Sequence, residues 1–467
     1  MDSAGLRLLE IVERSQTGPP CRMLEFDTKL LWKKLEQLVK EYDIKYDPAN
    51  PLPADNSLAD DLYEAGLALF LDLGILSIDK ERLIKFDEDE VKACLRDLIP
   101  EVVLGAGRDA RRVYRREVED STPPIVFGGP FGGLLSPGRP FVDAMTSMAK
   151  EPIVSMIYYG SLEEIEGRRI VGGSPIELHA ARCESRWMRE AAARAGRPGM
   201  HLVGSAALSA AAEIANSDPI MGYRPTDGRN AVLQTSLKID YNTLNKVKHF
   251  LDYSTFIYTY YVDLVGGFTG GPETTAIAAV ASHLANMMIN QATYQAICIV
   301  DIHEVNTTNR KCVWAQNLVG QAIARKTKII TFHTCMTSSG PCTQTILYEA
   351  AATALGVSAG VNLLGVMGTG SKLKDRYTGL EQRFYGETGY AAARLKREDA
   401  NELTKQVLER YEGSLKNPNR GKPFQECYDL GDLKPKQEWL EIYEKVKRDL
   451  TDLGMEYTAT SDLTTRR

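Results

Sequence analysis

The chain has 467 residues, 43% of them hydrophobic, and 62 acidic residues against 56 basic ones give a net charge of −6 at pH 7. This length and hydrophobic content suffice for one large domain with extensions. The acidic balance argues against a nucleic-acid partner. No apolar run of about 18 residues and no secretion signal occur. We therefore expect a cytoplasmic protein without a membrane partner. Its eight cysteines form no CxxC pair and are expected to be reduced thiols.

Residues 1–118 are predicted to form a helical N-terminal extension. Apolar residues recur at helical spacing from Leu30 to Val39 and from Leu58 to Leu69, with a proline-rich connection over 46–53. Five arginines then follow the spacing of one helix face: Arg108, Arg111, Arg112, Arg115 and Arg116. We interpret this stripe as a solvent-exposed or subunit-contacting face, or as a docking surface for an acidic partner.

Residues 119–380 are predicted to form a (β/α)₈ TIM barrel of the α/β class. Short apolar strands alternate with helical segments, which favours parallel pairing through crossovers, and eight such units match the usual barrel length of about 250 residues. The eight predicted strands are 125–127, 153–158, 200–203, 220–223, 256–262, 296–302, 328–333 and 360–367. Residues 381–467 return to a helical pattern and are predicted to form a C-terminal extension packed on the barrel.

Side chains at the carboxyl ends of these strands are the candidates for a site, because ligands bind at that face of a barrel. His201 and Val203 share one face of the third predicted strand. Two later strands end in polar clusters, where His303, Glu304, His333 and Cys335 could converge on a zinc ion. Glu304 is also a candidate for contact with the substrate. The spacing of these four residues matches no known metal motif, which favours the alternative interpretation that these side chains are hydrogen-bonded residues without a metal.

An aromatic strand provides a second candidate. Tyr258 and Tyr260 lie two residues apart and share one strand face. If that face is inward, they could present ring faces to a cation together with Tyr223 from the preceding predicted strand. An ordinary aromatic core is the alternative interpretation.

Short blocks along almost the whole chain resemble the monomethylamine:corrinoid methyltransferases. The matching blocks are 103–109 (VLGAGRD), 195–200 (AGRPGM), 237–240 (LKID), 270–275 (GGPETT), 340–342 (GPC) and 421–429 (GKPFQECYD). The resemblance implies a TIM barrel, usually in a symmetric homo-oligomer. It also implies transfer of a methyl group from an amine to the Co(I) corrinoid (cobalamin) of a separate carrier protein.

The residues that this family uses in its site differ here. The family's pyrrolysine position falls on Val203, with a length difference that leaves 201–204 open. Its two active-site glutamates fall on Asn230 and Tyr260, and its glutamine falls on Thr334. The resemblance therefore supports the fold and the carrier partner and leaves the methyl donor open.

Three catalytic hypotheses follow. In the first, a quaternary ammonium donor, already charged, is bound by the tyrosines in place of a carboxylate. In the second, zinc held by His303, Glu304, His333 and Cys335 polarises an oxygen or sulfur donor. In the third, His201 or His333 acts as general acid and base on monomethylamine. A chain that has lost catalysis and serves as a binding protein is the remaining alternative.

Overall fold

The structure is a computed structural model that describes residues 3–204, 209–218, 220, 222–253 and 256–457. Its centre is a closed barrel of eight parallel strands, which follow one another around the barrel in chain order. The strands are β5 (Val126–Gly128), β6 (Met156–Tyr158), β9 (His201–Gly204), β10 (Gly228–Asn230), β12 (Phe256–Tyr260), β14 (Tyr294–Ile297), β16 (Thr331–Met336) and β17 (Asn362–Met367). The predicted (β/α)₈ barrel is confirmed.

Seven predicted strands overlap an observed strand, and the fourth prediction is wrong. The fourth barrel strand is β10, Gly228–Asn230, and not 220–223. The predicted strand 296–302 is divided between β14 and β15 (Ile299–Asp301). The latter pairs with β13 (Asp263–Val265) in a separate two-stranded sheet.

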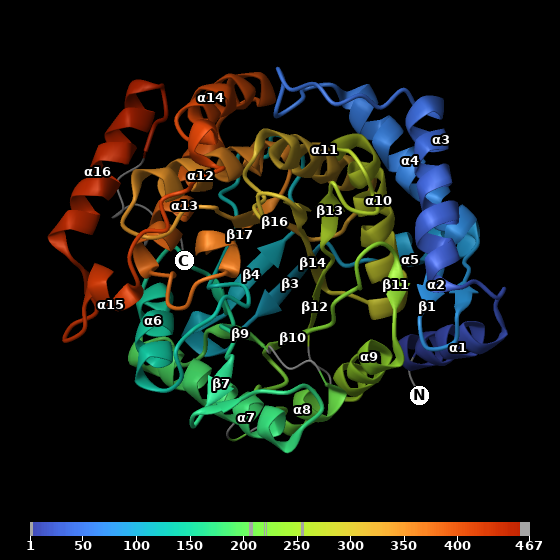
Figure 1. The fold of residues 1–467 in the computed structure, drawn as a ribbon, viewed down its shortest axis with the longest axis horizontal. Helices are drawn as coiled ribbons and strands as arrows, with labels where there is room; N and C mark the ends of the chain where they lie inside the picture. Colours follow the sequence, from blue (N-terminus) through green and yellow to red (C-terminus); the bar gives the residue numbers. More distant parts are fainter. Residues whose placement is uncertain (1–2, 205–208, 219, 221, 254–255, 458–467) are drawn as a thin grey trace.

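A ring of helices surrounds the barrel, as Figure 1 shows. The helices that follow successive strands are α6 (Arg139–Ala149), α7 (Pro175–Arg194), α8 (Ala210–Ala215), α9 (Tyr241–Tyr253), α10 (Pro272–Ala285), α11 (Arg310–Lys326), α12 (Gln344–Ala354) and α13 (Gly379–Ala392). The predicted domain boundary at residue 380 falls in the first turn of α13. Because α13 packs against α6, α12 and β17, it belongs with the barrel helices.

The N-terminal segment packs on one side of this ring. Its helices are α1 (Ser3–Thr17), α2 (Met23–Glu25), α3 (Trp32–Glu41), α4 (Asn56–Leu73) and α5 (Glu88–Asp97). The predicted helical runs correspond to α3, with the π-helical turn before it, and to α4. Helix α4 packs against α10 and α11, and Gly66 allows the close approach because a Cβ there would lie 2.4 Å from Val280. Strands β1 (Ile75–Ser77) and β2 (Arg82–Ile84) join β11 (Lys238–Ile239) in a small sheet.

The arginine stripe does not form the predicted helix. Strand β3 (Glu101–Leu104) pairs antiparallel with β4 (Arg111–Tyr114), so the arginines lie on a hairpin and in the segment after it. The hairpin contacts residues at the N-terminal ends of barrel strands. Ala106 N donates to Gly199 O at 2.8 Å, and Asn362 Nδ2 donates to Tyr114 O at 2.9 Å. The hairpin therefore lies under the N-terminal end of the barrel.

The end of the C-terminal segment packs on the opposite side from the N-terminal helices, whereas its first helix lies next to the N-terminal segment (Figure 1). The segment contains α14 (Arg397–Glu409), α15 (Phe424–Cys427), the short strands β18 (Tyr428–Asp429) and β19 (Lys434–Pro435), and α16 (Gln437–Asp452). Helix α14 packs on α12, and Leu52 N donates to Asn401 Oδ1 at 3.0 Å, which joins the two terminal segments. Among the described helices, none has the length and apolar character needed to cross a membrane.

Candidate active site

Aromatic side chains fill the interior of the barrel. Phe127, Tyr294 and Phe332 pack edge to face in its middle, with ring centroids 5.7 to 6.2 Å apart. Tyr258 packs on Phe127 at 5.4 Å and on Tyr158 at 5.2 Å. Because successive strand residues alternate between the two faces, these contacts fix which residues of each strand point inward.

The four positions suggested by the family resemblance all lie on inward faces. Val203 pairs in register with Tyr158 on β6, and its Cγ2 lies 2.9 Å from where a Cβ on Gly228 would stand. Asn230 pairs with the inward Tyr258. Tyr260 and Thr334 each lie two residues beyond an inward aromatic residue, Tyr258 and Phe332 respectively. Strand geometry therefore brings these positions to the carboxyl end of the barrel.

Tyr260 lies at the centre of this end of the barrel. Its ring packs on Phe131 at 4.8 Å and on Tyr258 at 6.1 Å. Burial raises the pKa of Tyr260 to about 12. Hydrogen bonds with Asn230, Tyr158 and Tyr159 act in the opposite direction and are outweighed by burial. Its side chain is half-buried, whereas those of Tyr158 and Tyr258 are fully buried. Tyr260 is therefore the ring through which this cluster meets solvent.

Several buried polar atoms at this end have no hydrogen-bond partner among the described residues. They are Asn230 Oδ1, Thr334 Oγ1 and the hydroxyls of Tyr158 and Tyr258. A buried polar atom without a partner costs about 1 to 3 kcal/mol, and such atoms cluster where a ligand or water completes the bonding. Their shared direction, into the barrel, marks this end as the candidate site.

No charged side chain points into the barrel from its strands. None of the eight described barrel strands contains Asp or Glu, and their one basic residue is Arg229. Arg229 points outward, where it forms a buried ion pair with Glu213 and stacks over Phe250 at 5.2 Å. The site can therefore attract a cation through ring faces but holds no strand carboxylate for proton transfer.

His201 lies inside the barrel, but both ring nitrogens are occupied. Nδ1 lies 2.8 Å from Thr226 O, which can only accept, so Nδ1 carries the proton. Nε2 then accepts from the hydroxyl of Tyr294 at 2.8 Å. Burial lowers the pKa of His201 to about 4, so the ring is neutral at pH 7. This arrangement leaves neither nitrogen for a substrate, which does not support the predicted acid and base role.

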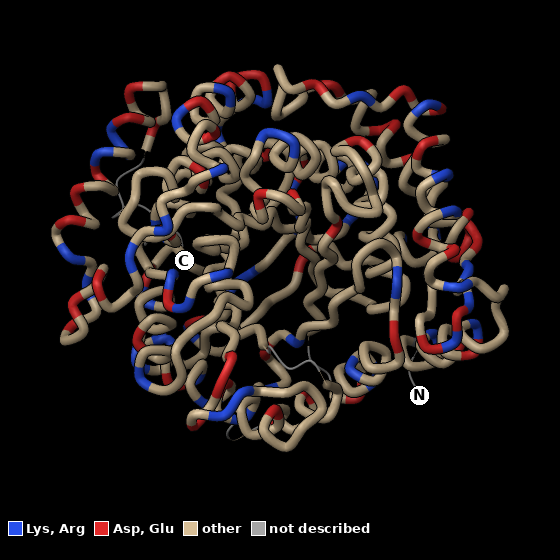
Figure 2. Tube along the Cα trace, in the orientation of Figure 1, with Lys and Arg blue, Asp and Glu red and all other residues tan. Residues whose placement is uncertain are grey.

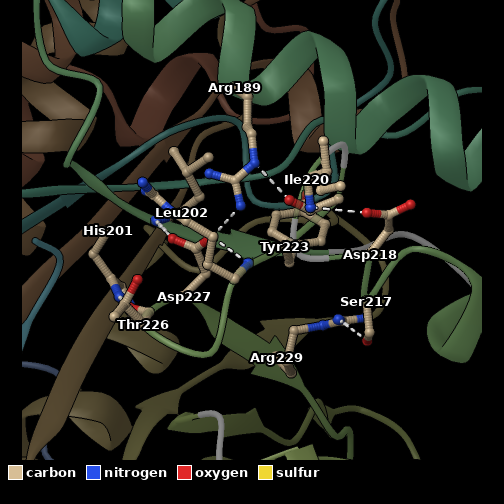
Figure 3. A network of polar contacts seen from close by, with 12 residues as sticks. Arg189, His201, Leu202, Ser217, Asp218, Ile220, Tyr223, Thr226, Asp227 and Arg229 are labelled. Carbon is tan, nitrogen blue, oxygen red and sulfur yellow. Dashed lines mark hydrogen bonds and ion pairs between the residues drawn. The ribbon is translucent and has the colours of Figure 1, made fainter.

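A polar network holds β9 beside β10 (Figure 3). Arg189 from α7 donates to Gly222 O at 2.5 Å and to Asp227 at 2.9 Å. Asp227 also accepts from Leu202 N at 3.3 Å, which fixes the start of β9. Because α7, the loop before β10 and β9 share one buried carboxylate, the inward residues of both strands are held in register.

Tyr223 does not join the aromatic cluster, so the predicted three-tyrosine cage is corrected. Its ring lies outside the barrel, over the guanidinium of Arg229 at 5.1 Å, and its hydroxyl donates to Glu184 at 3.4 Å. Gly204 is needed there because a Cβ would lie 1.8 Å from the Tyr223 ring. The other rings around Tyr260 come from Tyr158, Tyr159 and Phe131.

The four predicted zinc ligands do not come together. Within the described residues, no group of three His, Cys, Asp or Glu side chains could hold a metal ion. His333 and Cys335 lie on the outward face of β16, opposite to Thr334. His333 Nε2 donates to Gln316 O on α11 at 2.9 Å, and burial lowers the pKa of His333 to about 4. Cys335 is buried, and burial raises the pKa of its thiol.

The other two predicted ligands lie in the loop after β15. His303 is exposed, and Glu304 accepts from Asn309 Nδ2 at 2.8 Å and Asn306 Nδ2 at 3.4 Å. The outward direction of His333 also removes it as an acid and base inside the barrel. The zinc hypothesis and the predicted substrate role of Glu304 therefore have no support from the side-chain geometry.

The rule that strand-end side chains are candidates already includes Tyr158, the last residue of β6, and Tyr159 directly after it, whose ring centroids lie 4.5 Å apart. Sequence reasoning missed Phe131, which lies in the glycine-rich loop after β5. Phe131 gave no signal, because its place depends on how the loop folds back over the barrel.

The fold is that of a TIM-barrel methyltransferase, as comparison with known proteins shows. The family model for monomethylamine methyltransferase MtmB matches residues 6–455. Monomethylamine methyltransferase MtmB1 of Methanosarcina barkeri is 30% identical over 96% of this chain and 97% of its own length. MtmB1 of Methanosarcina acetivorans is 31% identical over the same shares.

Solved structures agree with the sequence comparison. The crystal structure of the Methanosarcina barkeri monomethylamine methyltransferase superposes with a TM-score of 0.92 at 30% identity, over 96% of this chain and 98% of that one. The crystal structure of a hydroxylamine complex of MtmB gives the same values. The chain therefore belongs to the monomethylamine methyltransferase MtmB family and is a methyltransferase.

Proposed function

We propose that this enzyme transfers a methyl group from a small quaternary ammonium compound to the Co(I) corrinoid of a separate carrier protein. Two observations carry the donor assignment. The eight described barrel strands contain no acidic residue, and four aromatic rings pack together at the carboxyl end of the barrel: those of Phe131, Tyr158, Tyr258 and Tyr260. A permanent cation can be held by ring faces alone, at about 0.5 to 2 kcal/mol for each favourable contact.

The proposed chemistry needs little proton transfer from the chain. The corrinoid, when bound, supplies the nucleophile. The C–N bond of the donor breaks, its electron pair stays on nitrogen, and a neutral tertiary amine leaves. A quaternary nitrogen has no proton to lose, so no general base is required. The chain holds the cation against Tyr260 and points one methyl group out of the barrel end, which is a positioning role.

Asn230 and Thr334 give the donor a second point of attachment. Asn230 Oδ1 and Thr334 Oγ1 have no partner among the described residues and face into the same end of the barrel. A hydroxyl or amide hydrogen on the donor would satisfy Asn230 Oδ1, and an oxygen on the donor would accept from Thr334. A quaternary ammonium compound with one polar arm, such as a betaine or a choline, therefore fits better than tetramethylammonium.

The test is a spectroscopic assay of Co(I) corrinoid methylation with a cognate carrier protein. The donors are betaines, choline, tetramethylammonium, trimethylamine, dimethylamine and monomethylamine. We expect methylation with the quaternary donors and none above background with monomethylamine. Turnover of monomethylamine alone would contradict the proposed donor and restore the substrate named in the relatives. Turnover of no donor, with the carrier shown to accept methyl groups from another source, would contradict the proposal entirely.

A further inference from the structure

A cavity lies at the other end of the barrel from the proposed methyl-transfer site. Its volume is about 820 Å³, within the range of about 300 to 1,000 Å³ typical of small-molecule sites. Its walls come from the β3–β4 hairpin, from the segments before β5 and β6, from the turn after α7 and from the end of α13. Those segments precede their strands, so the cavity opens at the N-terminal face.

The cavity is lined by basic side chains in marked excess. Six are Lys or Arg: Arg108, Arg111, Arg112, Lys150, Arg197 and Arg394. The one carboxylate in the lining belongs to Asp109, which is buried and accepts a hydrogen bond from Gly199 N at 2.9 Å. The lining therefore carries five more positive charges than negative ones.

Three of these arginines have no carboxylate partner among the described residues: Arg108, Arg111 and Arg394. Arg108 donates to Gly196 O at 2.8 Å, and Arg111 donates to Ala110 O at 2.8 Å, so their hydrogen bonds go to backbone oxygens. Arg112 differs, because it pairs with Glu101 at the edge of the hairpin. Cations gathered in a concave site without counter-charges attract an anion more strongly than the same charges on a convex surface.

Flat apolar surfaces line the rest of the cavity. Tyr114 and Tyr390 are half-buried. Burial raises the pKa of Tyr390 to about 12, and the nearby charge of Arg111 opposes this shift. Pro123, Pro124 and Ile153 complete this wall. A ring could stack on the tyrosines while the arginine forks hold phosphate oxygens in pairs.

We propose that this cavity binds a phosphorylated small molecule, up to the size of a nucleoside polyphosphate. Arg108 and Arg111 on the hairpin and Arg394 at the end of α13 would hold the phosphates. The ligand is not the methyl donor, because strands β6 and β9, about 10 to 13 Å long, separate the two sites. By joining the hairpin to α13, it stabilises the N-terminal closure of the barrel.

Isothermal titration calorimetry of the full chain with ATP, pyrophosphate, citrate and adenosine tests the proposal. We expect ATP and pyrophosphate to bind, adenosine not to bind, and affinity to fall as sodium chloride is raised. The double variant Arg111→Gln with Arg394→Gln should bind pyrophosphate at least tenfold more weakly. A matched control, Lys445→Gln with Arg448→Gln on the exposed face of α16, should bind as the parent does.

Three results would overturn the proposal. They are failure of both phosphate probes to bind, equal affinity of the two double variants, and citrate binding as tightly as pyrophosphate. If the first variant alone changes the mass of the particle by light scattering and no anion binds, the face is a subunit interface instead. Hydrogen exchange over 101–114 gives a second readout that needs no variant, because pyrophosphate should slow it in the parent chain.

Discussion

Nε2 of His201 accepts a hydrogen bond from the hydroxyl of Tyr294 inside the barrel, at 2.8 Å, while Nδ1 donates to Thr226 O at the same distance. This pair joins β9 to β14 across the interior. The imidazole is neutral because its burial outweighs the opposing charge of Asp227.

The first prediction concerns acid stability. Burial lowers the pKa of His201, His283 and His333 from 6.5 to about 4. Between these two pH values the histidines are protonated in the unfolded chain and neutral in the folded chain. Stability contributed in this way is present above pH 6.5 and is lost as pH falls toward 4. At pH 5 each histidine should cost about 2 kcal/mol of unfolding free energy.

Urea denaturation of the parent and of His201→Gln at pH 7 and pH 5 measures this cost. The variant should lose less stability between the two pH values, by about 2 kcal/mol. His303→Gln, at an exposed position, is the matched control and should keep the parent's difference. Equal pH differences in all three chains would show that His201 is not held neutral by burial.

The second prediction compares two threonines that receive the same change. Thr259 Oγ1 bonds to Ala231 O and to Asn286 Oδ1, the latter at 2.7 Å, on the outer face of β12. Thr334 Oγ1 faces inward and has no hydrogen-bond partner of normal geometry among the described residues, although the thiol of Cys298 lies near it. Thr259→Val should lower the unfolding free energy by about 1 to 3 kcal/mol, and Thr334→Val should change it by less than about 0.5 kcal/mol.

Urea midpoints and methyl-transfer kinetics separate these two effects. Thr334→Val should raise the KM of a donor that carries an oxygen, with no matching loss of stability. If Thr334→Val proved as destabilising as Thr259→Val, its hydroxyl would have a structural partner and no role toward the donor.

The third prediction concerns the ring of Tyr260. Tyr260→Leu removes the ring face and should raise the KM for a quaternary donor about 2- to 30-fold, since one cation–π contact contributes about 0.5 to 2 kcal/mol. Tyr260→Phe keeps the ring and should stay within about twofold of the parent. Tyr261→Phe is the control, because Tyr261 faces outward against His283 at 5.0 Å. A Tyr260→Leu enzyme with an unchanged KM would remove the ring from the site.

The fourth prediction concerns the buried ion pair between Arg229 and Glu213. Arg229→Met leaves the carboxylate of Glu213 buried without its partner and should cost about 3 to 5 kcal/mol. The exposed pair of Arg112 and Glu101 is the comparison, and Arg112→Met should cost less than about 1 kcal/mol. Equal urea midpoints for the two variants would mean that the pair on β10 contributes no more than a surface pair.

The barrel was predictable because most of its strands are short apolar runs at regular intervals. Strand β10 is the exception. Its sequence is Gly-Arg-Asn, which has no apolar residue, because Gly228 makes room for Tyr294 and Arg229 is neutralised by Glu213. Both compensations come from residues that are distant from β10 in sequence and lie on other elements. The sequence of the strand itself therefore gave no reason to place it there.

The helix predicted from the arginine stripe was wrong for a related reason. Spacing alone predicted a helix, but Val102, Val103 and Val113 favour strands, and Gly105 adopts φ of +83° in the turn. The site shows the same limit. His333, Thr334 and Cys335 are adjacent in sequence, and strand alternation sends Thr334 inward and the other two outward, so a grouping by sequence proximity mixed two faces.

The hairpin beneath the barrel also bears on the order of events in a catalytic cycle. Because β3 and β4 cover the N-terminal end of the barrel, we expect the proposed donor to enter, and the demethylated amine to leave, at the carboxyl end, where the methyl acceptor must also approach. Donor and acceptor would therefore use the same end of the barrel and could not approach it at the same time. Steady-state kinetics should show a compulsory sequence in which the amine binds first, and excess carrier should slow turnover by trapping the spent amine inside.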